Sequence, residues 1–143
     1  MPKYTLRDSL YNCDYRLYVN ITCDRFISIM EKYLDDTSIL EGVENVEGMC
    51  VTGVNGGGMV IYIREFDIDN PHHIATLVHE CMHVTQRRLW RDCGIDSEDL
   101  EATAYHVSWL VDGFLSKIRA STRRQRADKN TTNNLTNRKT VIY

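Results

Sequence analysis

The feature of this sequence that most constrains its fold is a His-Glu-x-x-His motif formed by His79, Glu80 and His83. The motif lies in the segment 71–91, where the spacing of apolar residues predicts one long helix. Residues four apart on a helix lie on the same face, so the two imidazoles can reach one metal ion. The motif therefore predicts a metal site on a helix.

Zinc suits this pair, because a catalytic zinc ion takes three protein ligands and keeps a fourth position for water. Glu80 could then accept a proton from that water as it attacks a carbonyl group. The simpler alternative is a core helix whose histidines are satisfied by carbonyl groups and whose glutamate is solvated. Apolar residues around much of the helix indicate burial at the centre of a domain; they are Ile74, Leu77, Val78, Cys81, Met82, Val84 and Leu89.

Size and composition are those of one soluble domain, with 143 residues, 43% hydrophobic and 26% charged. No apolar run approaches the roughly 20 residues of a membrane span, and the first residues lack the pattern of a signal peptide. We therefore expect a cytoplasmic protein without membrane contact. The 5 cysteines have no C-x-x-C spacing, which predicts buried free thiols rather than disulfides or a cysteine zinc site.

Charge divides the chain into two parts. Residues 1–116 contain 9 Lys/Arg and 19 Asp/Glu, whereas residues 117–143 contain 8 Lys/Arg and only Asp128. Apolar periodicity also ends near residue 119, which predicts a domain at 1–119 and a basic, Asn/Thr-rich mobile tail at 120–143. The tail could contact nucleic acid or an acidic surface, or only aid solubility. Residues 140–143 could still dock as a strand.

Local patterns place the other elements. Segment 15–22 alternates as a strand does, and a helix capped by Asp24 is expected to run to about residue 35. Strands at 49–52 and 59–66 flank a glycine-rich turn, which predicts a hairpin. Asn70 is the expected N-cap of the motif helix, and Gly94 is its expected left-handed end. Residues 1–14 give no clear pattern.

A second helix is expected from Asp96 or Ser97. Its predicted core stripe is Leu100, Ala104, Val107, Val111, Phe114 and Ile118. A polar row runs beside that stripe and consists of Glu101, Tyr105, Ser108 and Asp112. Such a row is where a further ligand could enter a core shared with the motif helix.

The motif, 17 intervening residues and then Glu101-Ala-Thr-Ala-Tyr105 together resemble the gluzincin pattern and a group of small phage-type metallopeptidase-like proteins. The resemblance covers about residues 59–115. It implies an α+β, minimal zincin-like domain with a small, mostly antiparallel sheet, and Glu101 as the third zinc ligand. It also implies that the strand before the motif helix is a sheet edge, where Ile61, Tyr62 and Ile63 would pair with an extended peptide. Ala104 stands where many gluzincins have an acidic residue that orients a histidine.

The candidates for the third ligand are Glu98, Glu101, His106 and Cys93. Glu98 lies in the first turn, Cys93 lies beyond the end of the motif helix, and His106 points to a different side of the second helix from Glu101. Glu101 is favoured, because docking of the apolar stripe would carry its carboxylate toward the two imidazoles. His72 and His73 are expected to be exposed residues at the start of the motif helix.

These features predict a zinc-dependent peptide hydrolase with Zn²⁺ held by His79, His83 and Glu101. Glu80 would be the general base and would later protonate the leaving amine. Tyr105 is a candidate oxyanion donor or substrate contact, with packing as the alternative. The competing hypothesis is a protein that keeps the site but acts by binding a host or regulatory partner, with weak or no hydrolysis.

Overall fold

The computed structural model describes residues 3–138, with side chains up to residue 132. The chain has an α+β fold, as predicted. Its strands are β1 (Lys3–Asp8), β2 (Cys13–Val19), β3 (Gly48–Val51) and β4 (Met59–Ile63). Its α-helices are α1 (Cys23–Met30), α2 (Pro71–Thr85) and α3 (Leu100–Arg138). Two 3₁₀ turns, η1 (Ser38–Leu40) and η2 (Val43–Asn45), precede β3, and a π-helical segment, η3 (Gln86–Asp92), continues α2.

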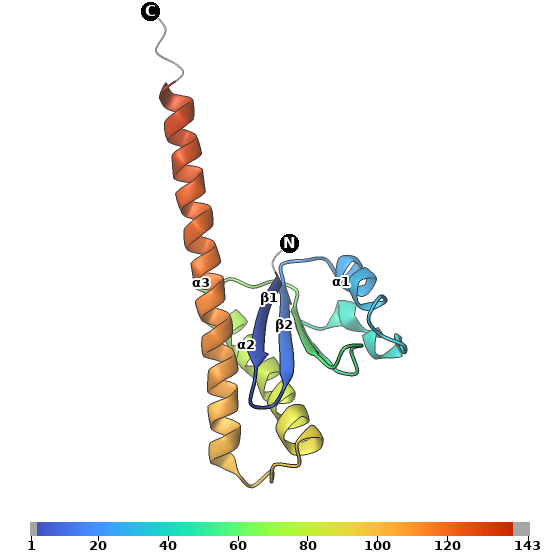
Figure 1. Ribbon diagram of the computed structural model, residues 1–143. Coiled ribbons are helices and arrows are strands. Elements are labelled where there is room, and N and C mark those ends of the chain that lie inside the picture. The colour runs from blue at the N-terminus through green and yellow to red at the C-terminus, as the bar shows by residue number, and fades with distance from the viewer. Residues whose placement is uncertain (1–2, 139–143) are drawn as a thin grey trace, which may run out of the picture.

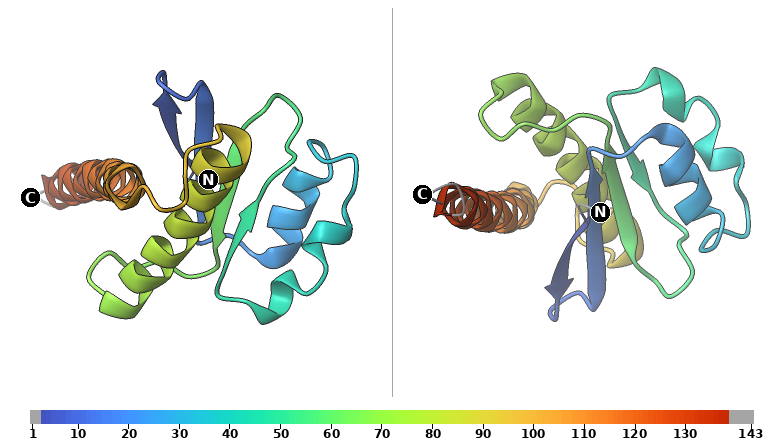
Figure 2. Two further views of the ribbon diagram at one scale, coloured as in Figure 1. Left: turned by 90° about the horizontal axis from the view of Figure 1, so that it is seen from below. Right: turned by 90° about the horizontal axis from the view of Figure 1, so that it is seen from above.

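The sheet is mixed, with the strand order β1-β2-β4-β3. β1 and β2 form an antiparallel hairpin, and β3 and β4 form the second hairpin that the glycine-rich turn predicts. The two hairpins join where β2 runs parallel to β4, with Tyr15 opposite Met59. Helix α1 covers one face of the sheet, and α2 and α3 lie on the other (Figures 1 and 2).

Alternation along the strands divides the core in two, because successive side chains point to opposite faces. Tyr15, Leu17 and Val19 of β2 pack on the side of α2 and α3. Tyr18 of β2 packs on the side of α1, together with Tyr62 of β4. Every residue of β4 is buried, as expected for a strand enclosed on both faces.

The short helix α1 begins two residues earlier than predicted, at Cys23. Thr22, not Asp24, caps it, because the Thr22 hydroxyl accepts a hydrogen bond from the backbone N–H of Arg25 at 3.2 Å. The helix ends at Met30, short of the predicted residue 35. Its buried side chains, Phe26 and Met30, lie one turn apart and face the sheet.

Helix α2 starts where the sequence predicts, and its π-helical continuation η3 carries the helical run to Asp92, close to the predicted end. The Asn70 side chain accepts a hydrogen bond from the backbone N–H of His72 at 2.9 Å, and Gly94 adopts a left-handed φ of 68° after the helix. The expectation of a helix buried around most of its surface is wrong, because His79 and His83 are exposed. The sheet side of α2 is fully buried at Leu77, Cys81 and Val84.

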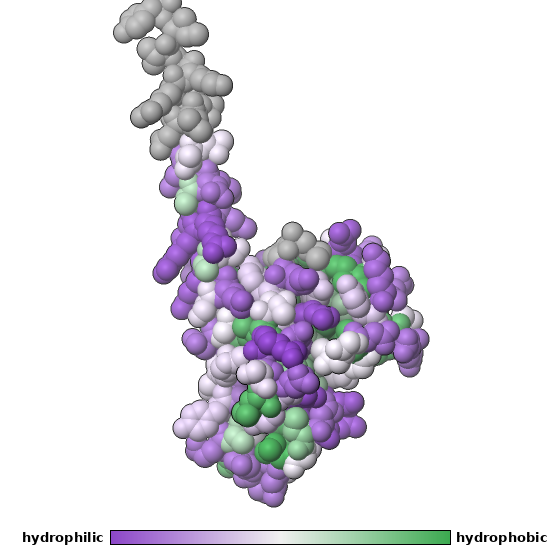
Figure 3. Space-filling view, viewed as in Figure 1, coloured by the Kyte–Doolittle hydropathy of each residue, from purple (hydrophilic) through white to green (hydrophobic). Residues whose placement is uncertain are grey.

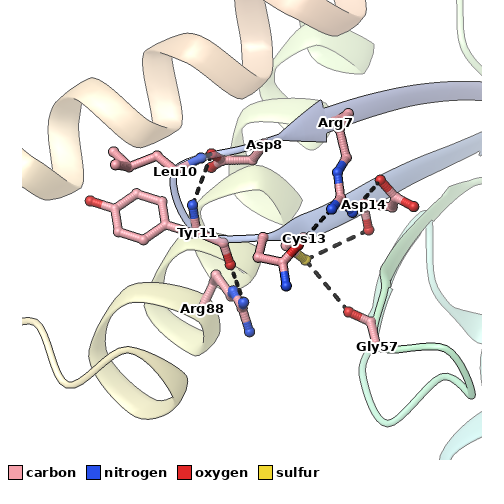
Figure 4. Close-up of polar contacts among 9 residues, drawn as sticks. Arg7, Asp8, Leu10, Tyr11, Cys13, Asp14, Gly57 and Arg88 are labelled. Atoms are coloured by element: carbon pink, nitrogen blue, oxygen red, sulfur yellow. Dashed lines mark hydrogen bonds and ion pairs between the residues drawn. The ribbon is translucent and has the colours of Figure 1, made fainter.

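The N-terminal hairpin is fixed to the end of the motif helix. Asp8 accepts hydrogen bonds from the backbone N–H groups of Leu10 and Tyr11 at 2.9 and 3.1 Å, which shapes the turn (Figure 4). Arg88 of η3 donates a hydrogen bond to the carbonyl of Tyr11, as the same view shows. β1, which the sequence did not predict, is thereby linked to the helix that carries the motif.

Helix α3 is longer than expected and continues to Arg138. Residues 120–138, predicted to form a mobile tail, are therefore helical here. The predicted docking of residues 140–143 as a strand lies outside the described residues. All 5 cysteines are free thiols. Within residues 3–138, no helix is long and apolar enough to cross a membrane.

Candidate metal site

The two motif histidines converge on the solvent side of α2. Their Nε2 atoms are 3.0 Å apart, and the rings meet edge to face at 86°. Two nitrogens that each lie about 2.0–2.1 Å from one tetrahedral zinc ion are roughly 3.3 Å from each other. The pair therefore fits a shared metal ion, with solvent able to reach its remaining positions.

Glu80 lies one residue on, about 100° further around the helix. It is 6% exposed and packs against Gly48 at the start of β3. A Cβ atom at Gly48 would lie 3.0 Å from Glu80 Cγ, so this position leaves room only for glycine unless the carboxylate moves. Burial raises the pKa of Glu80, and the nearby His79 and His83 partly oppose that rise. A carboxyl group of raised pKa is suited to accepting and returning a proton.

A cleft of about 440 Å³ lies between α2 and the start of β3. Its lining residues are Val46, Glu47, Gly48, Ala75, Thr76, His79 and Glu80. The cleft thus holds one histidine of the pair, the motif glutamate and the beginning of a strand. These three features come from different parts of the chain, and the packing of α2 on β3 brings them together.

The predicted substrate-pairing strand is not a sheet edge, and this prediction is wrong. β4 pairs with β2 on one side and with β3 on the other, so the backbone groups of Ile61, Tyr62 and Ile63 are already used. The sheet edge beside the motif helix is β3, which in the described chain has a neighbour only on its β4 side. Strand order depends on the parallel pairing of β2 and β4, which local sequence patterns do not reveal.

Most of the predicted core stripe of α3 does pack on the core, namely Val107, Val111, Phe114 and Ile118, but the first turns of the helix are rotated from the predicted orientation. Leu100 is 71% exposed and Ala104 is exposed, although both belong to the predicted core stripe. The residues that face the core are Thr103, His106, Leu110, Phe114 and Ile118. The predicted polar row, which contains Glu101 and Tyr105, consequently faces solvent.

The structure does not bring Glu101 to the histidine pair. Among the residues described, no group of three or more His, Cys, Asp or Glu side chains is placed to hold a metal ion. Glu98 and Cys93 are exposed as well. Tyr105 lines a separate cleft with Trp109 and His106, between α3 and the turn that joins β1 to β2. Of the predicted ligands, the described structure brings together only His79 and His83.

The other histidines of α2 have different partners. His72 Nε2 lies 2.8 Å from a carboxylate oxygen of Glu47, and both side chains are exposed. His73 Nδ1 accepts a hydrogen bond from the backbone N–H of Asp67 at 2.9 Å. As predicted, His72 is exposed; His73 is half-buried. Both contacts fix the start of α2.

A buried polar cluster that the sequence did not predict surrounds His106. Its two ring nitrogens lie 2.8 Å from the Thr85 hydroxyl and 3.0 Å from the Tyr15 hydroxyl. A carboxylate oxygen of Asp8 lies 3.5 Å from Nε2, the ring nitrogen that also contacts Tyr15. Burial lowers the pKa of His106, and Asp8 partly opposes this shift. The ring joins α3 to α2 and β2. The available signal was that the polar residues Thr103 and His106 lie at helical spacing with the apolar Leu110.

Comparison of the chain with protein-family models, curated proteins and solved structures found no match.

Proposed function

We propose that the chain is a zinc-dependent peptide hydrolase of the zincin, gluzincin-like type, similar to small phage-type metallopeptidase-like proteins and acting in the cytoplasm. The observation that carries this proposal is the single cleft that contains His79, Glu80 and the start of the outer strand β3. His79 and His83 would hold the metal through Nε2. A zinc ion there supplies a water of lowered pKa and a positive charge for a developing oxyanion.

Glu80 is the proposed general base. Its carboxylate accepts a proton from the attacking water and then donates that proton to the leaving amine of the peptide. Its burial against Gly48 holds the side chain in one place and raises its pKa, which favours both steps. The neighbouring imidazoles of His79 and His83 partly oppose the rise of this pKa.

The proposed substrate is an extended peptide that pairs with β3. An outer strand has backbone N–H and C=O groups that can form such pairs without requiring a particular sequence. Gly48, at the beginning of this strand, has no side chain to block access to Glu80. A peptide lying along β3 would therefore pass the motif glutamate and the histidine beside it.

Glu101 remains the proposed third ligand on the strength of the resemblance. It lies in the first turn of α3, where the Asp99 side chain accepts a hydrogen bond from the backbone N–H of Ala102 at 2.9 Å. Thr103 then holds the helix to η3, because its hydroxyl accepts a 3.1 Å hydrogen bond from the Trp90 indole. Because the described residues do not bring Glu101 to the histidine pair, its binding to the metal would require the start of α3 to move.

Metal content tests the histidine pair. We expect purified protein to bind about one zinc per chain, measured by mass spectrometry of metals after dialysis. His79→Ala and His83→Ala should each abolish this binding. His72→Ala is the matched control, since His72 is an exposed histidine of the same helix. Equal zinc content in all four proteins would refute the proposed site.

Catalysis is tested separately with Glu80→Gln. This variant should keep zinc and secondary structure but lose cleavage of a proteome-derived peptide library, which is analysed by mass spectrometry. Glu31→Gln, an exposed residue at the end of α1, is the control and should cleave normally. If the unaltered protein and Glu80→Gln give the same cleavage pattern, Glu80 is not the base.

One observation favours the alternative function. The described residues offer the metal only two protein ligands, which suits a site that binds metal without efficient hydrolysis. In that case the protein would act by binding a host or regulatory partner. Zinc-loaded protein that cleaves nothing, together with a Glu80→Gln variant of unchanged biological effect, would establish this alternative.

A further inference from the structure

The last part of α3 leaves the body of the protein. Ile118 is the last core residue of the helix, and residues 123–132 are all exposed. The helix continues away from the sheet and the other helices (Figure 1). We call residues 119–132 the arm. Figure 3 shows that the arm is almost entirely hydrophilic in this view.

The arm is strongly basic. It contains five positive side chains and one negative side chain: Arg119, Arg123, Arg124, Arg126, Lys129 and Asp128. In the part of the chain whose side chains are described, the ion pairs all involve residues before the arm. The rest of the chain is acidic, with 19 Asp/Glu and 9 Lys/Arg before residue 117. Positive charge is thus concentrated on the one element that projects.

The arm has little to hold it helical by itself. A helix that is polar on all sides needs many favourable i,i+4 pairs or a partner. Arg119 and Arg123 are four residues apart and repel each other, and Arg123 and Arg126 are three apart and do the same. Arg124 and Asp128 form the single favourable i,i+4 combination of charges in the arm. A polyanion would remove the repulsion and stabilise the helix.

We propose that the arm binds the phosphate backbone of nucleic acid. Phosphate contacts in such complexes come from Arg, Lys, Ser, Thr, Asn and Gln. Apart from Ala120, Ala127 and Asp128, the arm consists of these residue types alone. Arginine is well suited to this role, since its planar guanidinium can contact phosphate oxygens in pairs.

A protein partner fits the arm less well. Protein interfaces have a core of aromatic and other apolar residues that supplies most of the binding energy. The arm offers only Ala120 and Ala127. Binding to a phosphate backbone requires no such core, because released counterions provide the driving force. The acidic body would be repelled by the same polyanion, which leaves the arm as the contacting element.

The test is salt-dependent binding of the full chain to a fluorescently labelled 25-base-pair DNA duplex of mixed sequence, followed by anisotropy. The logarithm of the affinity should fall with the logarithm of salt concentration, with a slope of up to about −4.5 for five phosphate contacts. A triple variant of the arm should make this slope less steep by about 2.7; its substitutions are Arg119→Gln, Arg123→Gln and Arg126→Gln. Helical circular dichroism should also increase when DNA is added to the unaltered protein.

The control removes the same charge from the body. Lys3→Gln/Arg25→Gln/Lys32→Gln changes three exposed residues and should leave affinity and slope unchanged. Loss of binding in both triple variants would mean that only net charge matters, and would overturn the proposal. So would salt-independent binding. Equal affinity for polyglutamate, or self-association that the arm variant abolishes, would instead assign the arm to an acidic protein surface.

Discussion

Replacing His106 with leucine tests the observed rotation of α3. The substitution keeps a side chain of similar size but removes the partner of two buried hydroxyl groups, those of Tyr15 and Thr85. Both residues are 0% exposed, so water cannot take the place of the imidazole without rearrangement. The change therefore isolates the polar contribution of His106.

The expected loss follows from these contacts. Each unsatisfied buried hydroxyl costs about 1–3 kcal/mol. The additional apolar surface of a buried leucine returns about 1–2 kcal/mol. We therefore expect His106→Leu to reduce the free energy of unfolding by about 3 kcal/mol, a large part of the roughly 5–15 kcal/mol of a typical domain. Urea denaturation followed by circular dichroism measures this difference, with the slope of the transition as a check on the denatured state.

Leu100→Ser is the informative comparison. Leu100 is 71% exposed here, so its replacement should change stability by less than about 0.5 kcal/mol. In the orientation predicted from apolar spacing alone, Leu100 would be buried and His106 would point away from the site. Leu100→Ser would then be the more destabilising of the two substitutions. A large effect of Leu100→Ser and a small effect of His106→Leu would refute the observed packing and would return Glu101 to the side of α2.

Three further outcomes follow from named contacts. Gly48→Ala should lower peptide cleavage while zinc content stays constant, because the added methyl group would displace Glu80. A Cβ atom at Gly113 would lie 2.8 Å from the Leu6 side chain. Overpacking costs about 1–3 kcal/mol, and the gain in helix propensity from glycine to alanine is about 1 kcal/mol. Gly113→Ala should therefore lower the free energy of unfolding by about 1 kcal/mol, measured by urea denaturation. The free energy of unfolding should decrease as the pH falls below about 6.5. In that range His106 of the unfolded chain takes up a proton, whereas the buried ring resists protonation. The decrease should be at most about 1.4 kcal/mol per pH unit. That slope should be absent from His106→Leu, and an unchanged slope would mean that another group titrates.

Features coded by adjacent residues were predictable from the sequence. Asn70 and Pro71 begin α2, Gly94 follows its π-helical end, and the run of glycines after residue 52 joins β3 to β4. In each case the residue type favours one backbone conformation or supplies a nearby hydrogen bond. The spacing of His79 and His83 belongs to the same class, because an α-helix alone brings them together.

Features that depend on distant contacts were not predictable in the same way. The position of β4 at the centre of the sheet requires β2 to pair with it, and this pairing leaves β3 as the edge. The orientation of the first turns of α3 depends on the hydrogen bonds that join His106 to Tyr15 and Thr85, which make a polar residue favourable inside the core. Reasoning from apolar periodicity treats such a residue as exposed. The prediction that Glu101 is the third metal ligand depended on this assumption.

The joining of the two hairpins through β2 and β4 has a consequence for how the chain folds. Each hairpin connects neighbouring residues and can form early, whereas Tyr15 and Met59 are about 44 residues apart. Closing a loop of that length costs about 3 kcal/mol in chain entropy before the pairing is rewarded. We therefore expect the pairing of β2 with β4 to be the slow, non-local step of folding. Changes in this pairing should slow folding, whereas changes in the arm should leave the folding rate as it is.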